Sequence, residues 1–171
     1  MYTVEQKNAI ENHVFNKIHK ESLKEKLNFS GGSDQELGYL LLQIAKENKD
    51  EFAVILGVGY VFLEGADVSH SVWELISEIY FDEWHAEHEN IISSLAKLEG
   101  CNCVDFFYKA IYFIPEYLEY DENRALTRRI FFALGKHINC LGVKETLLKF
   151  LNCEDELWRS FAKEQLEIYM T

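Results

Sequence analysis

The sequence has little that would interrupt a helix. Its 171 residues include one proline, Pro115, and nine glycines. Proline and glycine usually separate the short strands of all-β proteins, so this scarcity favours helices joined by short turns. Hydrophobic residues make up 48% of the chain and aromatic residues 14%, which argues against a disordered chain. We therefore expect one all-α domain with a continuous core over residues 1–171.

Targeting segments and long apolar runs are also missing. The longest apolar run, 52–63, is interrupted by Gly57 and Gly59 and is shorter than the roughly 20 residues of a membrane-spanning helix. The first ten residues lack the basic stretch and apolar run of a signal peptide. We expect a cytoplasmic protein with no membrane partner, in which residues 52–63 belong to a buried helix.

The four cysteines do not form a recognisable framework. Without a secretion signal, they are predicted to be free thiols in a reducing compartment. Cys101 and Cys103 are too close in sequence for an unstrained disulfide in most geometries, and their CxC spacing differs from the CxxC of a zinc knuckle. We expect Cys101, Cys103, Cys140 and Cys153 to be reduced and to bind no zinc.

Basic side chains are scarce in one part of the chain. The net charge is −12 and the isoelectric point is near 4.9, which disfavours direct binding to nucleic acid or to an anionic membrane. Residues 64–122 hold 14 acidic and 2 basic side chains, whereas the remainder holds 15 of each. One segment thus carries the whole imbalance. It predicts either a surface for a basic protein partner or an ordinary solvated helix face.

Apolar periodicity predicts about nine helices. Ser33 and Glu36 form a capping box, and Pro115 should end the helix before it. The helix over 51–64 is apolar nearly all round and should be central. The predicted helices cover residues 4–27, 33–47, 51–64, 69 to about 81, about 86–98, 104–114, 122–138, 143–151 and 154–169.

The last four predicted helices look like two copies of a helical pair. The helix over 104–114 aligns with that over 143–151 at an offset of 40, with Phe107 opposite Leu147. Their partners align at an offset of 32. Such self-similarity fits a short α-solenoid, which divides the chain into N-terminal helices over 1–66 and repeats over 67–171.

Several segments carry a resemblance to a known family. They are Trp84-His-Ala-Glu-His-Glu89, Glu116-Tyr-Leu-Glu-Tyr-Asp-Glu122, Ala133-Leu134-Gly135 and Ala162 with Gln165-Leu166. Together they resemble small bacterial HEAT-repeat-like proteins that accompany polymorphic toxins, including those of contact-dependent growth inhibition, as cognate immunity proteins. The resemblance covers roughly residues 70–169. It implies a helical inhibitor that neutralises a toxin in the cytoplasm of the producing cell.

Motifs for catalysis or metal binding are not evident. His85 and His88 lie among carboxylates, but the string HAEHE is neither the HExxH of a zinc protease nor the paired ExxH of a di-iron bundle. No GxSxG, P-loop or GxGxxG occurs. We expect no metal, no cofactor and no enzymatic activity. Trp84 and one histidine are expected to be wedged between repeats.

The leading hypothesis is an immunity protein whose acidic segment binds a basic, nuclease-type toxin domain, because nucleases grip phosphates with Lys/Arg surfaces. The alternative is a HEAT-like adaptor or scaffold without a toxin partner. A DNA glycosylase is disfavoured, since a face that binds duplex should be basic. Gene neighbourhood would separate immunity protein from adaptor.

The residues predicted to face the partner are acidic or aromatic. Glu74, Glu78 and Asp82 follow at helical spacing away from the apolar stripe and should form an outward row. Tyr117 and Tyr120 either anchor the partner or pack the link 116–121 against the predicted helix over about 86–98. Arg128 and Arg129 should pair with nearby carboxylates or cap packing rather than bind phosphate, given the overall charge. The predicted partner-binding residues are Glu74, Glu78, Asp82, Glu83, Glu87, Glu89, Tyr117, Glu119, Tyr120, Asp121 and Glu122.

Overall fold

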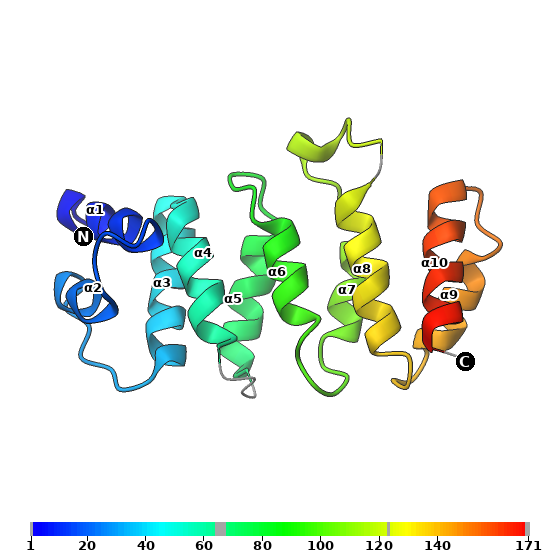
Figure 1. Ribbon diagram of the computed structural model, residues 1–171, viewed down its shortest axis with the longest axis horizontal. Helices are drawn as coiled ribbons and strands as arrows, with labels where there is room; N and C mark the ends of the chain where they lie inside the picture. The colour runs from blue at the N-terminus through cyan, green and yellow to red at the C-terminus, as the bar shows by residue number, and fades with distance from the viewer. Residues whose placement is uncertain (1, 64–67, 123, 170–171) are drawn as a thin grey trace. The chain divides into compact units, whose positions relative to one another are not determined.

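The computed structural model describes residues 2–63, 68–122 and 124–169, which form α-helices, one short 3-10 helix and no β-strand (Figure 1). This confirms the predicted all-α fold. The described part divides into two compact units, one ending at Asn90 and one beginning at Ile91. The elements are α1 (Val4–Val14), α2 (Lys20–Lys26), α3 (Asp34–Asn48), α4 (Glu51–Val61), α5 (His70–Tyr80), α6 (His88–Leu95), α7 (Val104–Ala110), η1 (Glu116–Leu118), α8 (Ala125–Lys136), α9 (Val143–Phe150) and α10 (Glu156–Tyr169).

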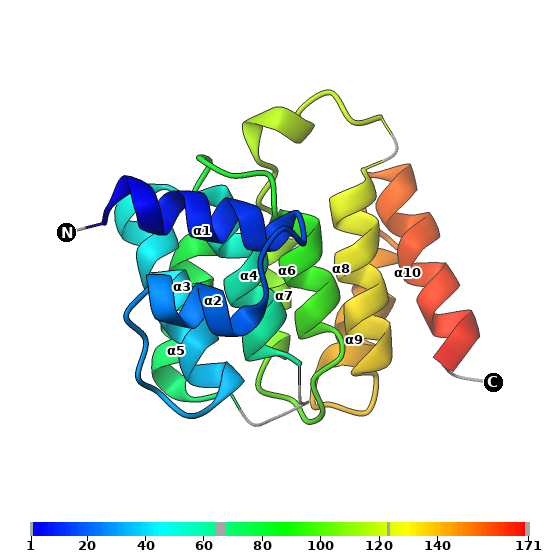
Figure 2. The ribbon, with the colours of Figure 1, turned by 60° about the vertical axis from the view of Figure 1, so that its left-hand side comes forward.

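The first predicted helix, 4–27, is two helices in the structure. A capping box of Thr3 and Gln6 opens α1, and the chain leaves the helix after Phe15. Asn16 has a φ of 56°, in the left-handed region that asparagine tolerates better than most residues. The turn lets α1 contact both α2 and α4. Figure 2 shows the two short helices running across the α3–α4 pair.

The hairpin of α3 and α4 is the centre of the first unit. The predicted capping box is present, since the Ser33 hydroxyl accepts the Glu36 N–H and the Glu36 carboxylate accepts the Ser33 N–H. The two helices approach closely at Gly38. A Cβ there would lie 2.7 Å from the Val61 nitrogen and 2.9 Å from the Gly57 carbonyl oxygen. Glycine at this position therefore permits backbone-to-backbone packing of the apolar helix that the sequence places at the centre.

The helix α5 buries the predicted apolar stripe and ends before the predicted bend. Its buried side chains are Val72, Leu75, Ile76, Ile79 and Tyr80. The chain between Asp82 and Glu87 is non-helical, and α6 then buries Ile91, Ile92 and Leu95. The predicted end of this last helix, Leu98, lies beyond α6 and is half-buried.

The second unit contains two antiparallel helical pairs, α7 with α8 and α9 with α10 (Figure 1). The second helices of the two pairs, α8 and α10, contact each other. An aromatic cluster lies among these helices, with ring centroids 5.0 Å apart for Phe131 and Phe150 and 5.5 Å apart for Phe150 and Trp158. The pairing fits the expected helical hairpins, while their assignment to HEAT-like repeats stays a prediction.

The link between α7 and α8 is longer than the sequence suggested. The helix α7 ends at Ala110 instead of Ile114, and the chain runs through buried Pro115 into η1. The helix α8 begins at Ala125, three residues after the predicted start at 122. The Asp121 carboxylate accepts the Ala125 N–H at 2.7 Å and so caps α8 from outside the helix. We call residues 111–124 the α7–α8 connection.

Candidate functional site

The acidic row on α5 contains two residues rather than three. Glu74 and Glu78 are exposed on the face opposite the buried stripe. Each has a cationic or titratable neighbour in the same unit: His70 Nε2 lies 3.3 Å from the Glu74 carboxylate, and Lys46 forms an ion pair with Glu78. Asp82 does not continue the row, because α5 ends at Tyr80.

These two carboxylates line an open groove between α3 and α5. Its volume is about 610 Å³, and the aromatic rings of Tyr39 and Trp73 contribute to its lining. The groove therefore combines apolar rings with negative charge. Because Lys46 already pairs with Glu78, part of that charge is compensated within the protein.

The histidines between α5 and α6 are structural. His85 and His88 are both buried, and their rings stack with centroids 4.4 Å apart. The Nδ1 atom of His85 accepts the Glu87 N–H at 3.1 Å, so the proton lies on Nε2, which donates to the Ile79 carbonyl at 2.7 Å. Both rings serve to close the turn, whereas the sequence predicted only one wedged histidine.

Burial and the neighbouring His85 keep His88 neutral. Its Nε2 atom lies 3.0 Å from the Asp82 carbonyl oxygen. Burial, and then the neighbouring His85, lower the pKa of His88 from its ordinary value of 6.5 to about 4, while hydrogen bonds to the Asp82 and Tyr80 backbone oppose the shift. In the part of the chain that the structure describes, no group of three or more His, Cys, Asp or Glu side chains has the arrangement of a metal site.

The carboxylates around these histidines have separate positions. Asp82 is half-buried and accepts the Trp84 indole N–H at 2.9 Å. Glu83 is exposed, and the half-buried Glu87 accepts a hydrogen bond from the Asn90 amide. Glu89 is half-buried in the first turn of α6. Asp82 is therefore committed to an internal contact, and Glu83 is the most open of the four.

The α7–α8 connection presents aromatic side chains to solvent. Tyr120 is 88% exposed, Tyr112 69% and Tyr117 46%. The packed alternative for Tyr120 is thus excluded in this structure, and Tyr112 is an exposed aromatic that sequence reasoning missed. Glu116, Glu119 and Glu122 of the same segment are also exposed, and residues 110–122 contain no lysine, arginine or histidine. The tyrosine–carboxylate surface consists of Tyr112, Glu116, Tyr117, Glu119, Tyr120 and Glu122.

A small pocket lies where this connection meets the start of α8. Its volume is about 170 Å³, and we call it the connection pocket. Among its lining residues are the predicted Glu119 and Asp121, together with apolar side chains that no sequence motif marked. The described residues that line it are Ile114, Leu118, Glu119, Asp121, Arg124, Leu126 and Thr127.

Arginines near this surface are held by partners in the second unit. Arg124 pairs with Asp155. Burial raises the pKa of Asp155, but the hydrogen bonds that its carboxylate accepts from the Trp158 N–H and from Arg124 outweigh burial, so the pKa is lowered overall. Arg128 Nη2 lies 3.1 and 3.2 Å from the two carboxylate oxygens of Glu164, as predicted. Arg129 donates to the Ser93 hydroxyl at 3.2 Å.

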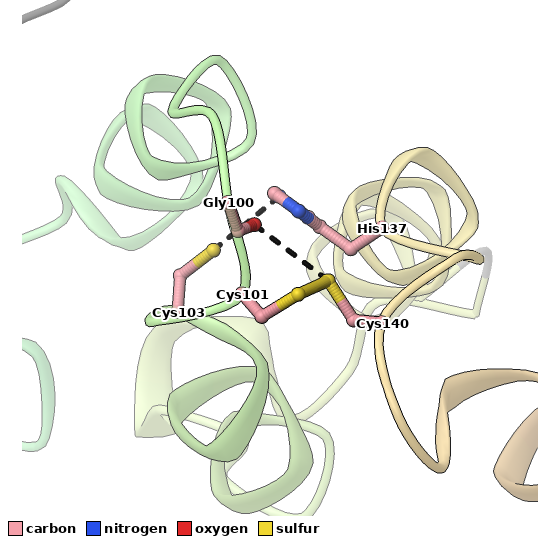
Figure 3. The surroundings of a disulfide bond; sticks show 5 residues. All are labelled: Gly100, Cys101, Cys103, His137 and Cys140. Carbon is pink, nitrogen blue, oxygen red and sulfur yellow. Dashed lines mark hydrogen bonds between the residues drawn. A yellow bond between two sulfur atoms is a disulfide. The ribbon is translucent and has the colours of Figure 1, made fainter.

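The prediction that all four cysteines are reduced is wrong. Cys101 and Cys140 form a disulfide with their Cα atoms 5.6 Å apart (Figure 3). The two residues lie 39 positions apart, in the turns that lead into α7 and α9. The antiparallel course of α7 and α8 returns the chain to the starting end of α7, which is why these turns meet. The CxC spacing bears on a bond between Cys101 and Cys103 only, and not on one between Cys101 and Cys140.

Cys103 stays a thiol beside this bond. Burial raises its pKa to about 11, and its Sγ lies 3.3 Å from the Nε2 atom of His137 (Figure 3). Burial also lowers the pKa of His137. Proton transfer from the thiol to the imidazole is therefore unfavourable, and the pair lacks the thiolate that a nucleophilic cysteine needs. Cys153, the other free cysteine, is half-buried.

No family model, curated protein or solved structure matches this chain. Function must therefore be argued from the residues and their geometry. Among the described residues, no helix has the length and apolar character needed to cross a membrane.

Proposed function

We propose that this chain is an immunity protein that binds a cognate, basic, nuclease-type bacterial toxin domain and covers the surface with which the toxin grips its substrate. The observation that carries the proposal is the tyrosine–carboxylate surface. It joins three exposed tyrosines and three exposed glutamates in a segment without a basic side chain. The segment Glu116–Glu122 within it is also one that resembles the HEAT-like immunity family.

The chemistry of this surface suits a basic protein. Tyrosine supplies a large ring at low entropic cost and a hydroxyl that can hydrogen-bond, which is why exposed tyrosines are frequent binding anchors. The carboxylates attract Lys/Arg side chains, accelerate encounter and disfavour acidic competitors. A nuclease presents such side chains where it holds phosphates, so an acidic inhibitor competes directly with nucleic acid.

The proposed site of action is the cytoplasm of the producing cell, on the strength of the family resemblance. Cytoplasmic thiols are normally kept reduced, so the Cys101–Cys140 disulfide now argues against this location. The redox state of these two cysteines in protein trapped directly from cells is the measurement that decides between the cytoplasm and an oxidising compartment.

The test of the proposed function is co-purification of the full chain with the product of the adjacent reading frame, followed by growth rescue of cells that express that product. The informative variant combines Glu119→Lys with Glu122→Lys. The matched control combines Glu25→Lys with Glu145→Lys, which makes the same charge change at exposed sites outside residues 64–122.

We expect the wild-type chain and the control to form the complex and rescue growth, and the informative variant to bind more weakly. Absence of a complex with the wild-type chain would overturn the proposed function. Growth rescue without a complex would overturn inhibition by binding.

A further inference from the structure

The Cys101–Cys140 disulfide lies at the surface of the second unit. Cys101 is exposed and Cys140 is half-buried, and Leu141, the next residue, is 99% exposed. Cleavage of a disulfide begins when a thiolate attacks one of its sulfurs, and the rate depends on access to that sulfur. Cys101 is the more accessible partner of this bond, so a thiolate from solution can reach the bond while the chain is folded.

The bond closes the base of the hairpin that α7 and α8 form. The closed loop runs from Cys101 to Cys140 and includes both helices, the α7–α8 connection and the tyrosine–carboxylate surface. Figure 1 shows the connection at one end of the two helices, and the turns before α7 and after α8 at the other end. Cleavage of the bond therefore removes the covalent link between the two ends of the segment that carries this surface.

A second contact joins the same two turns without a covalent bond. Cys103 is 1% exposed and precedes α7, and His137 follows the end of α8. The Cys103 Sγ atom lies 3.3 Å from His137 Nε2 (Figure 3), and the imidazole centroid lies 5.9 Å from that of the Phe107 ring in α7. These buried contacts do not depend on the disulfide, so they hold α7 against α8 after the bond is cleaved.

Cys103 does not compete for the bond. Burial raises the pKa of its thiol to about 11, and the form that attacks a disulfide is the thiolate. The CxC spacing also disfavours a bond between Cys101 and Cys103. The thiol nearest in sequence thus leaves the bond intact, and cleavage falls to a thiol from outside the chain.

We propose that the Cys101–Cys140 disulfide is a redox switch that opens and closes in the folded protein, and that a dithiol reductant attacks it at the Sγ atom of Cys101. One thiolate of the dithiol forms a mixed disulfide with Cys101, and the Cys140 sulfur leaves and takes up a proton. The second thiolate of the dithiol then attacks the reductant's own sulfur in the mixed disulfide, and the Cys101 sulfur leaves and takes up a proton. The protein disulfide gains two electrons and becomes two thiols, while the dithiol loses two electrons and becomes a disulfide.

The switch goes beyond the proposed function, and its test needs no toxin. It gives the chain a closed covalent state in an oxidising compartment and an open one in a reducing compartment. In the open state, the hairpin that carries the tyrosine–carboxylate surface is held by noncovalent contacts alone.

The experiment uses Cys103 as an internal reporter of unfolding. The full oxidised chain is treated with dithiothreitol in native buffer and pulsed at intervals with N-ethylmaleimide, and the label is located by peptide mass spectrometry. We expect Cys101 and Cys140 to gain the label at least about tenfold faster than the buried Cys103, because cleavage needs no opening of the core. In strong denaturant, all three should be labelled together. Cys153, a free thiol before and after reduction, is the internal standard for the pulse.

Glutathione locates the point of attack. A brief exposure to this monothiol, followed by excess N-ethylmaleimide, traps the mixed disulfide together with the thiol that has left. We expect glutathione on Cys101 and maleimide on Cys140 at least about fivefold more often than the reverse, because Cys101 is the more exposed partner.

The matched variant is Cys103→Ser, which keeps a hydrogen-bonding group beside His137 and removes the neighbouring thiol. Its reduction by dithiothreitol and its reoxidation by glutathione disulfide should proceed at the wild-type rates. The wild type should regain the Cys101–Cys140 pair on reoxidation.

Four results would overturn the switch. They are no cleavage in native buffer at a dithiothreitol concentration that cleaves the bond in denaturant, labelling of Cys103 together with Cys101 and Cys140 in native buffer, glutathione found mainly on Cys140, and reoxidation into pairs that contain Cys103. The first two would show that the bond opens only when the second unit unfolds. None of these measurements involves the toxin domain, so the switch and the proposed function stand or fall separately.

Discussion

The carboxylates of α5 and those of the α7–α8 connection differ in what surrounds them. On α5, Lys46 pairs with Glu78 and His70 lies beside Glu74, so the negative charge is partly compensated within the first unit. In the connection, residues 111–122 contain no basic side chain, Arg124 at its end pairs with Asp155, and exposed tyrosines stand among the carboxylates. The net charge of a segment therefore does not locate an interface by itself. Local compensation and exposed aromatic area separate a solvated helix face from a binding surface.

The two units also differ in how they are stabilised, and the largest predicted effect tests this. Reduction of the Cys101–Cys140 disulfide, or Cys140→Ser, should lower the free energy of unfolding by about 4 kcal/mol, because the bond closes a loop of 39 residues in the unfolded chain. Denaturant unfolding with and without reductant measures the change. Hydrogen exchange should place the greater loss of protection in α7–α10.

Cys153→Ser is the control for this experiment, because Cys153 is a free, half-buried thiol. It should change the free energy of unfolding far less than Cys140→Ser. If reduction leaves stability unchanged, or if α3 and α4 lose as much protection as α7–α10, the disulfide is not what distinguishes the second unit.

The first unit should respond to pH through His88. Its pKa is lowered to about 4 in the folded protein, so between pH 6.5 and 4 the unfolded chain binds more protons than the folded one. The contribution of neutral His88 to the free energy of unfolding is complete above pH 6.5, and it falls by about 3 kcal/mol as the pH drops to 4. His88→Gln, which keeps a donor for the Asp82 carbonyl, should remove this part of the pH dependence.

The measurement is the difference between the unfolding free energies of the wild type and His88→Gln at a series of pH values. The contributions of the carboxylates that both proteins share cancel in this difference. A difference that stays constant from pH 6.5 to 4 would contradict the neutral, buried His88. A difference that changes above pH 6.5 would assign the effect to another group.

Sequence patterns predicted best where one local rule decided the structure. The capping box of Ser33 and Glu36 and the apolar stripe of α5 are short-range signals, and both are present as expected. The break between α1 and α2 was missed because the apolar period continues across it and only Asn16, which adopts the left-handed conformation, marks the turn. A single asparagine is a weaker signal for the end of a helix than glycine or proline.

Features that depend on distant parts of the chain were not predictable from local patterns. The Cys101–Cys140 bond needs the turns before α7 and α9 to meet. The offset of about 40 between the two helical pairs was a usable signal, since stacking would bring their equivalent turns together. The connection pocket had no signal of comparable strength, because its walls come from both the connection and the start of α8.

Binding should depend more on the aromatic rings than on any one charge. Tyr120→Ala should weaken binding of the proposed toxin domain about 30-fold, or roughly 2 kcal/mol, if the exposed ring becomes a buried anchor in the complex. Stability should change by no more than about 0.5 kcal/mol, because the side chain is largely exposed in the free protein. Calorimetric titration and denaturant unfolding provide the two measurements.

Tyr39→Ala, in the groove between α3 and α5, is the comparison for this variant. A larger loss of affinity for Tyr39→Ala than for Tyr120→Ala would place the anchor in the first unit. Equal losses would show that both surfaces carry the binding energy and that the distinction between them is wrong.

The smallest predicted effect concerns association rates. Glu119→Lys with Glu122→Lys should slow association with the toxin domain about 10-fold at low salt, and the difference should shrink as salt screens the charges. Glu74→Lys with Glu78→Lys should slow it less, because Lys46 already offsets part of that charge. Asp82 is left unchanged, since its carboxylate accepts the Trp84 indole N–H and its reversal would disturb the fold. Glu25→Lys with Glu145→Lys controls for net charge. Stopped-flow kinetics at two ionic strengths would separate these cases.

If all three double reversals slow association equally, the toxin senses only the total charge of −12, and the compensation seen on α5 has no consequence for recognition. If the α5 variant is the slowest, the steering surface lies in the first unit, and the tyrosines of the connection serve only after encounter.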